Sequence, residues 1–375
     1  MKKKFLCLAF SALLAAGFTS CSDNDPEMPD DPNNPNQPNN PENPSEPVSY
    51  GAYIVSSGAQ SVNITGSLGY INYENNTMSE DVFYQANGMY VGDTFNGGCV
   101  YNDFILLAVT DSKVLHIVDR NTLKLIKTIQ PSTDAGPRQV TAYDGYIYTT
   151  LYGSPGYLCR IDPKTYKCEL IEVGPQPEYV VAFKDMIYVA VSDGYSTTFD
   201  ESCIAVVDPK TFTVQTTIKG IKNPVQLGTN GEQLFVCSWG EYDVDWTQIN
   251  YGIYEIKDNK LSDMIQEATM MAVSGNNIYS ICAPWDVTPT YNVYDISTKK
   301  ASEWIPSEQG VFAPNGMGVD PVTGDVFILS FVEGGYGYPD YNGRGYVSRY
   351  ASDGTFKSKY DTGVGPVNVF FNAYE

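Results

Sequence analysis

Histidine is almost absent from this chain of 375 residues, and positively charged side chains are scarce. The single histidine, His116, lies in the apolar run VLHIVD, which favours an ordinary strand position over a catalytic or metal-binding role. Lysine and arginine together number 23 against 44 aspartates and glutamates, which gives a formal net charge of −21. A Ser-His-Asp triad and a histidine-rich metal site are therefore disfavoured, and nucleic acid is a poor partner.

The motifs of common enzyme classes are also missing. The sequence contains no G-x-S-x-G, H-E-x-x-H, P-loop or Rossmann fingerprint. Three acids, Glu241, Asp243 and Asp245, lie together in one segment, where they could serve glycoside chemistry or hold a calcium ion. A solvated loop is the more frequent role of such a group. We therefore predict no catalytic residue and no metal site, and we expect a protein that is not an enzyme.

The N-terminal segment has the features of an export signal. Residues 1–20 combine a basic start with an apolar stretch and small residues before Cys21, and are too short for a spanning helix. The ending FTSC resembles a bacterial lipobox, which implies cleavage before Cys21 and lipidation of that residue. The following CSDNDPE resembles the acidic tag that sends lipoproteins of Bacteroidetes-type bacteria to the outer face of the outer membrane. We expect a lipid-anchored protein that faces the cell exterior, with the lipid as its sole membrane contact.

Residues 21–49 have the composition of a tether. From Pro26 to Pro47 a proline occupies every third position, with mostly polar residues between. Such a segment has little apolar surface to bury and cannot offset the entropy of ordering. Polyproline II has three residues per turn and rises about 3.1 Å per residue, so we predict an extended stalk, or otherwise a disordered linker.

Abundant tyrosine, glycine and proline favour strands and turns in the remaining residues, 50–375. A strand that ends in a polar turn recurs seven times, at intervals that average about 46 residues, as expected for propeller blades. The copies are NYENNT at 72–77, IVDRNT at 117–122, RIDPKT at 160–165, VVDPKT at 206–211, EIKDNK at 255–260, VYDIST at 293–298 and RYASDG at 349–354.

A short strand, usually opened by proline, precedes each repeat, but its seventh copy, PVNVFF at 366–371, lies at the C-terminus. We therefore predict an all-β, seven-bladed β-propeller over residues 50–375. In it the C-terminal strand joins the N-terminal blade and closes the ring, which leaves no open sheet edge around the channel. With strands A to D counted outward from the axis, the A–B and C–D turns share one face of the ring. The B–C loops and D–A connections share the other face.

The B–C loops carry most of the candidate binding residues. They contain three of the four tryptophans and many tyrosines, whereas the A–B and C–D turns are short and polar. Some of these rings could prop the loops and others contact a ligand. The D–A connections add the polar residues Arg138, Gln139 and Asn315 to the same face, near the mouth of the channel. Tyr179, Gln226 and Asn368 occupy similar places in their repeats. The candidate ligand-binding residues are Tyr152, Tyr195, Trp239, Tyr242, Trp246, Tyr251, Trp285, Tyr336, Tyr338, Tyr341, Arg138, Gln139 and Asn315.

Eight cysteines are present, of which Cys7 belongs to the signal and Cys21 to the lipidation site. Cys159 and Cys168 flank the RIDPKT turn symmetrically, so they could face each other across a hairpin and form a disulfide in an oxidising envelope. A bulged turn would separate the pair. The other cysteines are interpreted as small buried apolar residues, since no metal-type spacing occurs.

The lipobox with its acidic tag, the stalk and the ring of V-x-D-P-K-T repeats together resemble surface lipoproteins of gut Bacteroidetes with YncE-like propellers, in particular the BtuG type. This resemblance implies capture of cobalamin (vitamin B12) and its transfer to a TonB-dependent outer-membrane transporter, with cobalamin as ligand and no cofactor required. Aromatic rings and Gln, Asn and Arg side chains suit the apolar edges and neutral amides of a corrin rim. Glycan capture, a propeller lyase or lactonase, and a protein-adhesion scaffold are the alternatives.

Overall fold

The computed structural model of the protein describes residues 46–374. The predicted signal peptide at 1–20, the predicted lipidation site Cys21 and the predicted tether up to residue 45 lie outside the described residues. The first strand begins at Val48, two residues before the predicted start of the propeller. Within the described residues, no helix has both the length and the apolar character needed to cross a membrane.

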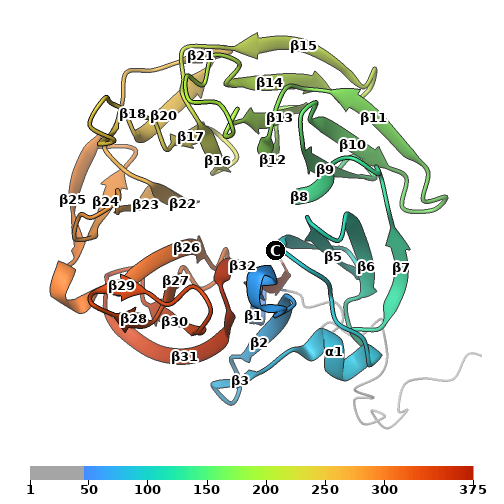
Figure 1. Ribbon diagram of the computed structural model, residues 1–375, viewed down its shortest axis with the longest axis horizontal. Helices are drawn as coiled ribbons and strands as arrows, with labels where there is room; N and C mark the ends of the chain where they lie inside the picture. The colour runs from blue at the N-terminus through green and yellow to red at the C-terminus, as the bar shows by residue number, and fades with distance from the viewer. Residues whose placement is uncertain (1–45, 375) are drawn as a thin grey trace, which may run out of the picture. The chain divides into compact units, whose positions relative to one another are not determined.

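Seven four-stranded antiparallel sheets stand around a central axis, which confirms the predicted all-β, seven-bladed propeller (Figure 1). In the order A to D, blade 1 contains β32 (Pro366–Tyr374), β1 (Val48–Ser56), β2 (Ser67–Asn72) and β3 (Thr77–Ser79), and blade 2 contains β4 (Phe95–Tyr101), β5 (Phe104–Val109), β6 (Val114–Asp119) and β7 (Leu125–Ile129). Blade 3 contains β8 (Gly136–Tyr143), β9 (Tyr146–Tyr152), β10 (Tyr157–Ile161) and β11 (Cys168–Glu172), and blade 4 contains β12 (Pro177–Phe183), β13 (Met186–Val191), β14 (Cys203–Asp208) and β15 (Thr213–Ile218). The strands of blades 5 to 7 are β16 (Pro224–Thr229), β17 (Leu234–Ser238), β20 (Gly252–Lys257), β21 (Lys260–Leu261); β22 (Met270–Ser274), β23 (Asn277–Cys282), β24 (Thr290–Asp295), β25 (Lys300–Ile305); and β26 (Ala313–Val319), β27 (Val326–Phe331), β30 (Arg344–Tyr350), β31 (Phe356–Val364).

A few short elements lie outside the blades. The helix α1 (Val82–Asn87) belongs to the connection from blade 1 to blade 2. Two small hairpins extend the B–C loops of blades 5 and 7, and two 3-10 turns complete the set. These elements are β18 (Glu241–Tyr242) with β19 (Gln248–Ile249), β28 (Glu333–Gly335) with β29 (Tyr338–Pro339), η1 (Gln60–Val62) and η2 (Ser307–Gln309).

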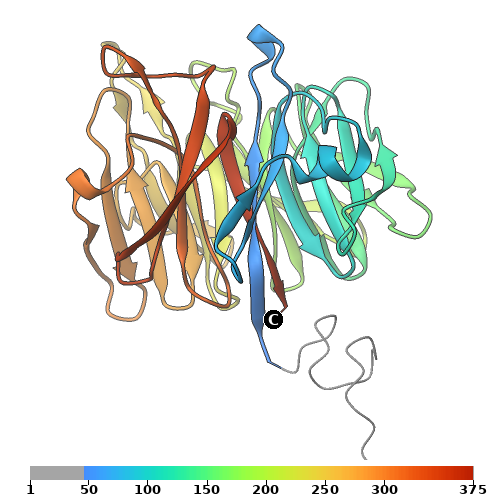
Figure 2. The same cartoon turned by 90° about the horizontal axis from the view of Figure 1, so that it is seen from below.

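The first and last strands close the ring, as the repeat order predicts. β32 lies beside β1 in one sheet, with Ala52 opposite Phe371 and Val55 opposite Asn368. The Tyr53 ring stacks on Phe370 at 5.0 Å. In Figure 2, β1 (blue) rises from the lower rim of the ring, and the C-terminus lies at the same rim. The first and the last strand of the propeller therefore hold each other in place.

A second tie joins this closing blade to blade 7 through Asp320, whose side chain is fully buried. Its Oδ2 accepts hydrogen bonds from the hydroxyls of Ser49 in β1 (2.5 Å) and of Tyr73, the residue after β2 (2.9 Å). Its Oδ1 accepts from the backbone N–H groups of Val322 and Thr323, both at 2.9 Å. One carboxylate therefore fixes its own turn and holds the start of the first strand.

The repeated polar turns fold as the sequence predicts. In the second DPKT copy, Oδ1 of Asp208 accepts the N–H of Lys210 at 2.8 Å, and the N–H of Phe212 returns to the carbonyl of Asp208 at 2.8 Å. Phe212 adopts a left-handed conformation (φ 51°) and buries its ring between blades. The aspartate thus turns the chain and the residue after threonine enters the core.

His116 is a buried residue of β6, which confirms its predicted place in a strand. Its Nε2 lies 2.9 Å from the Val91 carbonyl oxygen, and its Nδ1 lies 2.9 Å from the Thr128 hydroxyl. The carbonyl requires a proton on Nε2, so Nδ1 accepts from the hydroxyl and the ring is neutral. Burial lowers the pKa of His116, and the hydrogen bond to Val91 opposes this effect only in part.

Cys159 and Cys168 do not face each other directly, and both are free thiols in this structure. The register places Cys159 opposite Leu170 and Cys168 opposite Ile161. The reason is Tyr166, which takes a left-handed conformation (φ 59°) and lengthens the turn beyond DPKT. The two side chains remain diagonal neighbours, and a hydrogen bond between them raises the pKa of Cys159 and lowers the pKa of Cys168.

Candidate functional site

The two rims of the ring differ in the loops that they carry. The A strand β32 ends at the lower rim in Figure 2, and the sheets are antiparallel, so the A–B and C–D turns of the ring occupy that rim. The B–C loops and D–A connections, including η1 and both small hairpins, occupy the upper rim. We call these the turn rim and the loop rim. The loop rim is the face that the sequence predicts to bind.

A polar mouth opens at the axis on the loop rim. It is a cavity of about 240 Å³ to which every blade contributes the residue at one equivalent position near the start of its A strand. In six of the seven blades the ladder between strands A and B has a bulge at this point. A bulge leaves a residue unpaired and re-aims its side chain. The seven residues in blade order are Val367, Asn96, Arg138, Glu178, Val225, Met270 and Asn315.

These seven positions are not equivalent in chemistry. The residues of blades 2, 3, 4 and 7 are polar or charged, whereas those of blades 1, 5 and 6 are apolar. Arg138 and Glu178 form the sole ion pair among the seven, with Nε 2.7 Å from Oε2. The pair cancels its own charge. The mouth is therefore close to neutral, with its polar residues concentrated on blades 2 to 4 and Asn315 set among the apolar residues of the other blades.

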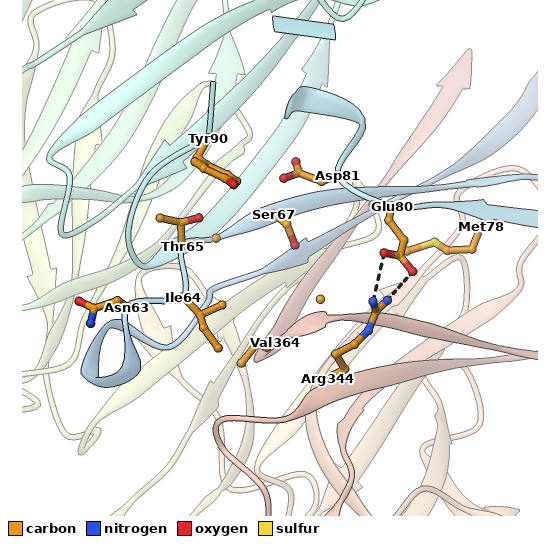
Figure 3. A pocket seen from close by; sticks show the side chains of 13 residues that line it. Asn63, Ile64, Thr65, Ser67, Met78, Glu80, Asp81, Tyr90, Arg344 and Val364 are labelled. Atoms are coloured by element: carbon orange, nitrogen blue, oxygen red, sulfur yellow. Dashed lines mark hydrogen bonds and ion pairs between the residues drawn. The ribbon is translucent and has the colours of Figure 1, made fainter. Parts of the chain in front are cut away.

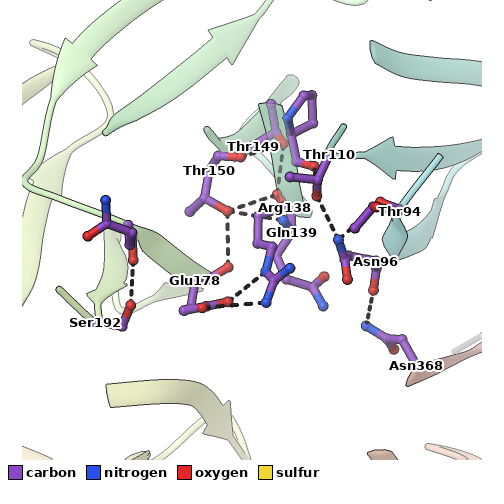
Figure 4. A network of polar contacts seen from close by, with 12 residues as sticks. Thr94, Asn96, Thr110, Arg138, Gln139, Thr149, Thr150, Glu178, Ser192 and Asn368 are labelled. Carbon is purple, nitrogen blue, oxygen red and sulfur yellow. Dashed lines mark hydrogen bonds and ion pairs between the residues drawn. The ribbon is translucent and has the colours of Figure 1, made fainter. Parts of the chain in front are cut away.

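Arg138 is held in place by Glu178, as Figure 4 shows, and by the ring of Tyr152. Besides its bond to Glu178, its guanidinium lies 4.8 Å from the centre of the Tyr152 ring. Tyr195 packs edge-on against Tyr152 at 5.5 Å. Burial raises the pKa of Tyr152, and the Glu178 carboxylate adds to the shift, so the ring stays neutral at physiological pH. Nη1 of Arg138 has no partner among the described residues, so it is available to an acceptor on a ligand.

The amides of the mouth tie neighbouring blades together. Nδ2 of Asn315 donates to the Pro366 carbonyl at 2.9 Å, and Nδ2 of Asn368 donates to the Asn96 carbonyl at 3.3 Å. Oε1 of Gln226 accepts the Met271 N–H at 2.9 Å. Each side-chain amide thus uses one of its two polar atoms, the nitrogen of Asn315 and Asn368 and the oxygen of Gln226. The other end, a carbonyl oxygen on both asparagines and an NH₂ group on Gln226, has no partner within residues 46–374 and can meet a ligand.

An aromatic cavity of about 620 Å³ adjoins the mouth on the side of blades 5, 6 and 7. Trp239 and Asn315 line both spaces, so the two are continuous. The Trp239 indole N–H donates to the Thr269 carbonyl at 2.8 Å, which fixes the orientation of its ring. The aromatic rings that line the cavity are Trp239, Tyr242, Trp285, Phe312, Phe331, Tyr338 and Tyr341. They come from the B–C loops of three blades, from one D–A connection (Phe312) and from the end of β27 (Phe331).

Comparison with known proteins supports the fold alone. No protein-family model matches the chain, and no curated protein matches it. A chain of hydrazine synthase from Kuenenia stuttgartiensis is similar in structure, with a TM-score of 0.55 over 72% of this chain and 87% of that chain. The two sequences are 15% identical. This similarity supports the β-propeller fold of the chain.

The structure brings eight of the thirteen candidate residues to the mouth or the aromatic cavity. Arg138, Gln139 and Asn315 line the mouth, and Trp239, Tyr242, Trp285, Tyr338 and Tyr341 line the cavity. Tyr179, Gln226 and Asn368, which were expected nearby, also line the mouth. These residues come from blades 1, 3, 4, 5, 6 and 7, so the common face was predictable from the repeat order.

The other five candidates lie outside both spaces. Tyr152 and Tyr195 support Arg138 from the side. Trp246 lies at the tip of its loop with 78% of its surface exposed, and Tyr336 is fully exposed at the tip of the β28–β29 hairpin. Tyr251 is partly buried and hydrogen-bonds to Cys282. Tyr251 therefore props its loop.

Sequence reasoning missed several lining residues. Glu178 follows Pro177 as Arg138 follows Pro137, so alignment of the short strands would have identified it. Met270 occupies the same position in blade 6 but lacks the preceding proline. Phe312 and Phe331 flank strands, where an apolar residue ordinarily signals core. No local signal separates them from core residues.

Acidic side chains of the segment 241–245 form hydrogen bonds within their own loop. Oδ1 of Asp243 accepts the N–H groups of Asp245 (2.9 Å) and Thr247 (2.8 Å). Glu241 accepts from the amide of Asn250 at 3.0 Å. Across residues 46–374, no three His, Cys, Asp or Glu side chains are grouped so that they could hold a metal ion. The role of these acids in the structure is to shape the loop.

Proposed function

We propose that the protein is a cell-surface lipoprotein of the BtuG type, which captures cobalamin at the loop rim and passes it to a TonB-dependent outer-membrane transporter. The observation that carries the proposal is the continuity of the aromatic cavity with the half-polar mouth. A bulky ligand with apolar edges and neutral amides needs both kinds of surface side by side. The volume of about 620 Å³ lies within the range of about 300 to 1,000 Å³ typical of small-molecule pockets.

The polarity of the mouth supports a neutral ligand. Its one ion pair is internally balanced, and its remaining polar side chains, which are amides and hydroxyls, are neutral. Amides of a ligand can donate to the carbonyl oxygens of Asn315 and Asn368 and accept from Gln226 and from Nη1 of Arg138. No proton transfer or bond cleavage is required, which is consistent with a binding protein.

The site is also rigid before any ligand arrives. Trp239 is fixed by its bond to Thr269, Arg138 by Glu178 and Tyr152, and the asparagines by neighbouring strands. Side chains that are already ordered lose little entropy on binding. Tight capture without catalysis follows from such an arrangement.

Titration calorimetry with cyanocobalamin tests the proposal. We expect saturable binding by the purified protein at micromolar ligand or below. Trp285→Ala removes a cavity ring that is 66% exposed, so it should weaken binding by about tenfold or more without loss of fold. Trp246→Ala is the matched control, because this ring belongs to the same rim but lies outside the cavity, and we expect unchanged affinity.

Two results would contradict the proposal. Absence of heat at micromolar cyanocobalamin excludes cobalamin as the ligand. Equal binding by the wild type and Trp285→Ala would mean that the ligand does not enter the aromatic cavity. If oligosaccharides compete for the same cavity, the glycan-capture alternative replaces cobalamin, since sugars also stack on exposed rings.

A further inference from the structure

A separate groove of about 440 Å³ lies near the loop rim where blade 7 meets blade 1 (Figure 3). None of its lining residues belongs to the mouth or to the aromatic cavity. Its walls come from the loop around η1, the start of β2, the connection that carries α1, and the ends of β30 and β31. We call it the seam groove. The proposed capture of cobalamin makes no use of it.

One wall of the seam groove is a tyrosine platform. Tyr90 lines the groove with 57% of its surface exposed. Tyr84, from α1, stacks against the Tyr90 ring with centroids 4.7 Å apart and planes 26° apart. The connection itself is anchored, because Phe83 and Val91 are buried in the core of the blades on either side. The exposed ring is therefore held in position by a second ring and a fixed backbone, as a stacking surface requires.

The facing wall presents planar polar groups. The Arg344 guanidinium and the Glu80 carboxylate pair in parallel, with Nη2 to Oε1 at 2.6 Å and Nη1 to Oε2 at 3.1 Å. This hydrogen bonding lowers the pKa of Glu80, so the carboxylate remains charged. Both side chains are about half exposed at the groove, and the pair fixes their planes.

The floor of the groove holds polar side chains that can still form hydrogen bonds with a ligand. The Asn63 amide and the hydroxyls of Thr65 and Ser67 line the groove and make no side-chain hydrogen bond to any described residue. Asp81 accepts the Tyr84 N–H at 3.2 Å and a backbone hydrogen bond from Leu68, so it is held in place at the edge of this floor. A ligand would thus meet several donors and acceptors within reach of one aromatic ring.

The charge of the groove narrows the class of ligand. Glu80 and Asp81 outnumber Arg344, so phosphates and other anions are disfavoured. A purely apolar ligand would leave the polar floor without partners, which is costly. A pyranose fits both conditions, since it has an apolar C–H face and a rim of hydroxyls that both donate and accept.

We propose that the seam groove is a binding site for neutral carbohydrate, in which a pyranose ring stacks on Tyr90 and its hydroxyls meet the Arg344–Glu80 pair and the polar floor. The site is distinct from the cobalamin site proposed above. It gives the protein a second contact, with a saccharide.

Saturation-transfer difference NMR of the purified protein tests this site, with maltohexaose, cellohexaose, xylohexaose and mannohexaose offered in turn. We expect at least one of them to bind, and Tyr90→Ala to weaken that binding by about tenfold or more. Tyr336→Ala removes a tyrosine that is more exposed than Tyr90 and lies away from the groove, and this variant should bind as the wild type does. Far-ultraviolet circular dichroism checks that each variant is folded.

Each remaining outcome counts against the proposal. Absence of transfer from all four saccharides refutes it, and so does binding that Tyr90→Ala leaves unchanged. Saccharide binding lost in Trp285→Ala instead would move the sugar to the aromatic cavity. Cyanocobalamin affinity measured on Tyr90→Ala should equal that of the wild type, so failure of one proposal leaves the other standing.

Discussion

Replacement of Asp320 by alanine should weaken the closure of the ring far more than the same change in an equivalent turn. Asp320 and Asp208 each begin a D-P-x-T turn, and each carboxylate accepts two backbone N–H bonds of its own turn. Asp320 alone adds the hydroxyls of Ser49 and Tyr73, which belong to the closing blade. Comparison of Asp320→Ala with Asp208→Ala therefore isolates the contribution of the Ser49 and Tyr73 hydrogen bonds to the free energy of unfolding.

The magnitude follows from the type of bond. Loss of the local turn bonds should cost about 1 kcal/mol in either variant. Hydrogen bonds to a charged acceptor contribute about 1.5 to 3 kcal/mol each. Because Asp320 is fully buried and two hydroxyls would be left without an acceptor, we expect Asp320→Ala to lose about 4 to 7 kcal/mol in total.

Urea unfolding at neutral pH, followed by tryptophan fluorescence, measures both variants. The urea concentration at the midpoint of unfolding should be clearly lower for Asp320→Ala than for Asp208→Ala. The slope of the unfolding free energy against urea concentration should change little. If Asp320→Ala and Asp208→Ala lose the same free energy within about 0.5 kcal/mol, the tie between blades 7 and 1 contributes nothing and the reasoning is wrong.

Three further predictions follow from the same structure. Truncation after Gly363 deletes β32, so the Val55–Asn368 pairing is lost and we expect a broad, non-cooperative melt by calorimetry. The pKa of His116 is lowered in the fold, so the unfolded chain binds a proton first as pH falls below about 6.5, and stability should drop there. Urea titrations at two pH values should give a smaller drop for His116→Gln than for the wild type. Arg138→Met leaves Glu178 unpaired in the mouth, so cyanocobalamin binding should weaken by about tenfold or more in calorimetry, whereas an unchanged affinity would remove Arg138 from the site.

The fold was predictable because the repeat is redundant. Seven polar turns and seven short strands specify the blades many times over, and the displaced copy at 366–371 indicates how the ring closes. A single irregular repeat, such as EIKDNK at 255–260, does not disturb that count. The same redundancy placed Arg138 and Asn315 at the axis.

Details that depend on one residue's backbone conformation were not predictable. The left-handed Tyr166 shifts the register of β10 and β11 and separates Cys159 from Cys168, and tyrosine itself does not signal such a conformation, although Phe212 adopts it at the same place in the next repeat. Trp246 has a positive φ of 63° at a loop tip and lies outside the cavity that Trp239 lines. The position of Trp246 depends on how a long loop packs against its neighbours.

The position of β1 has a consequence for force. Its first residue, Val48, lies at the turn rim, so a pull through the preceding chain acts along the length of the strand (Figure 2). β1 is bonded on both sides, to β2 and to β32, and both neighbours run antiparallel to it. Such a pull shears two hydrogen-bonded ladders at once instead of opening them pair by pair. A propeller closed in this way resists a pulling force applied at the start of β1.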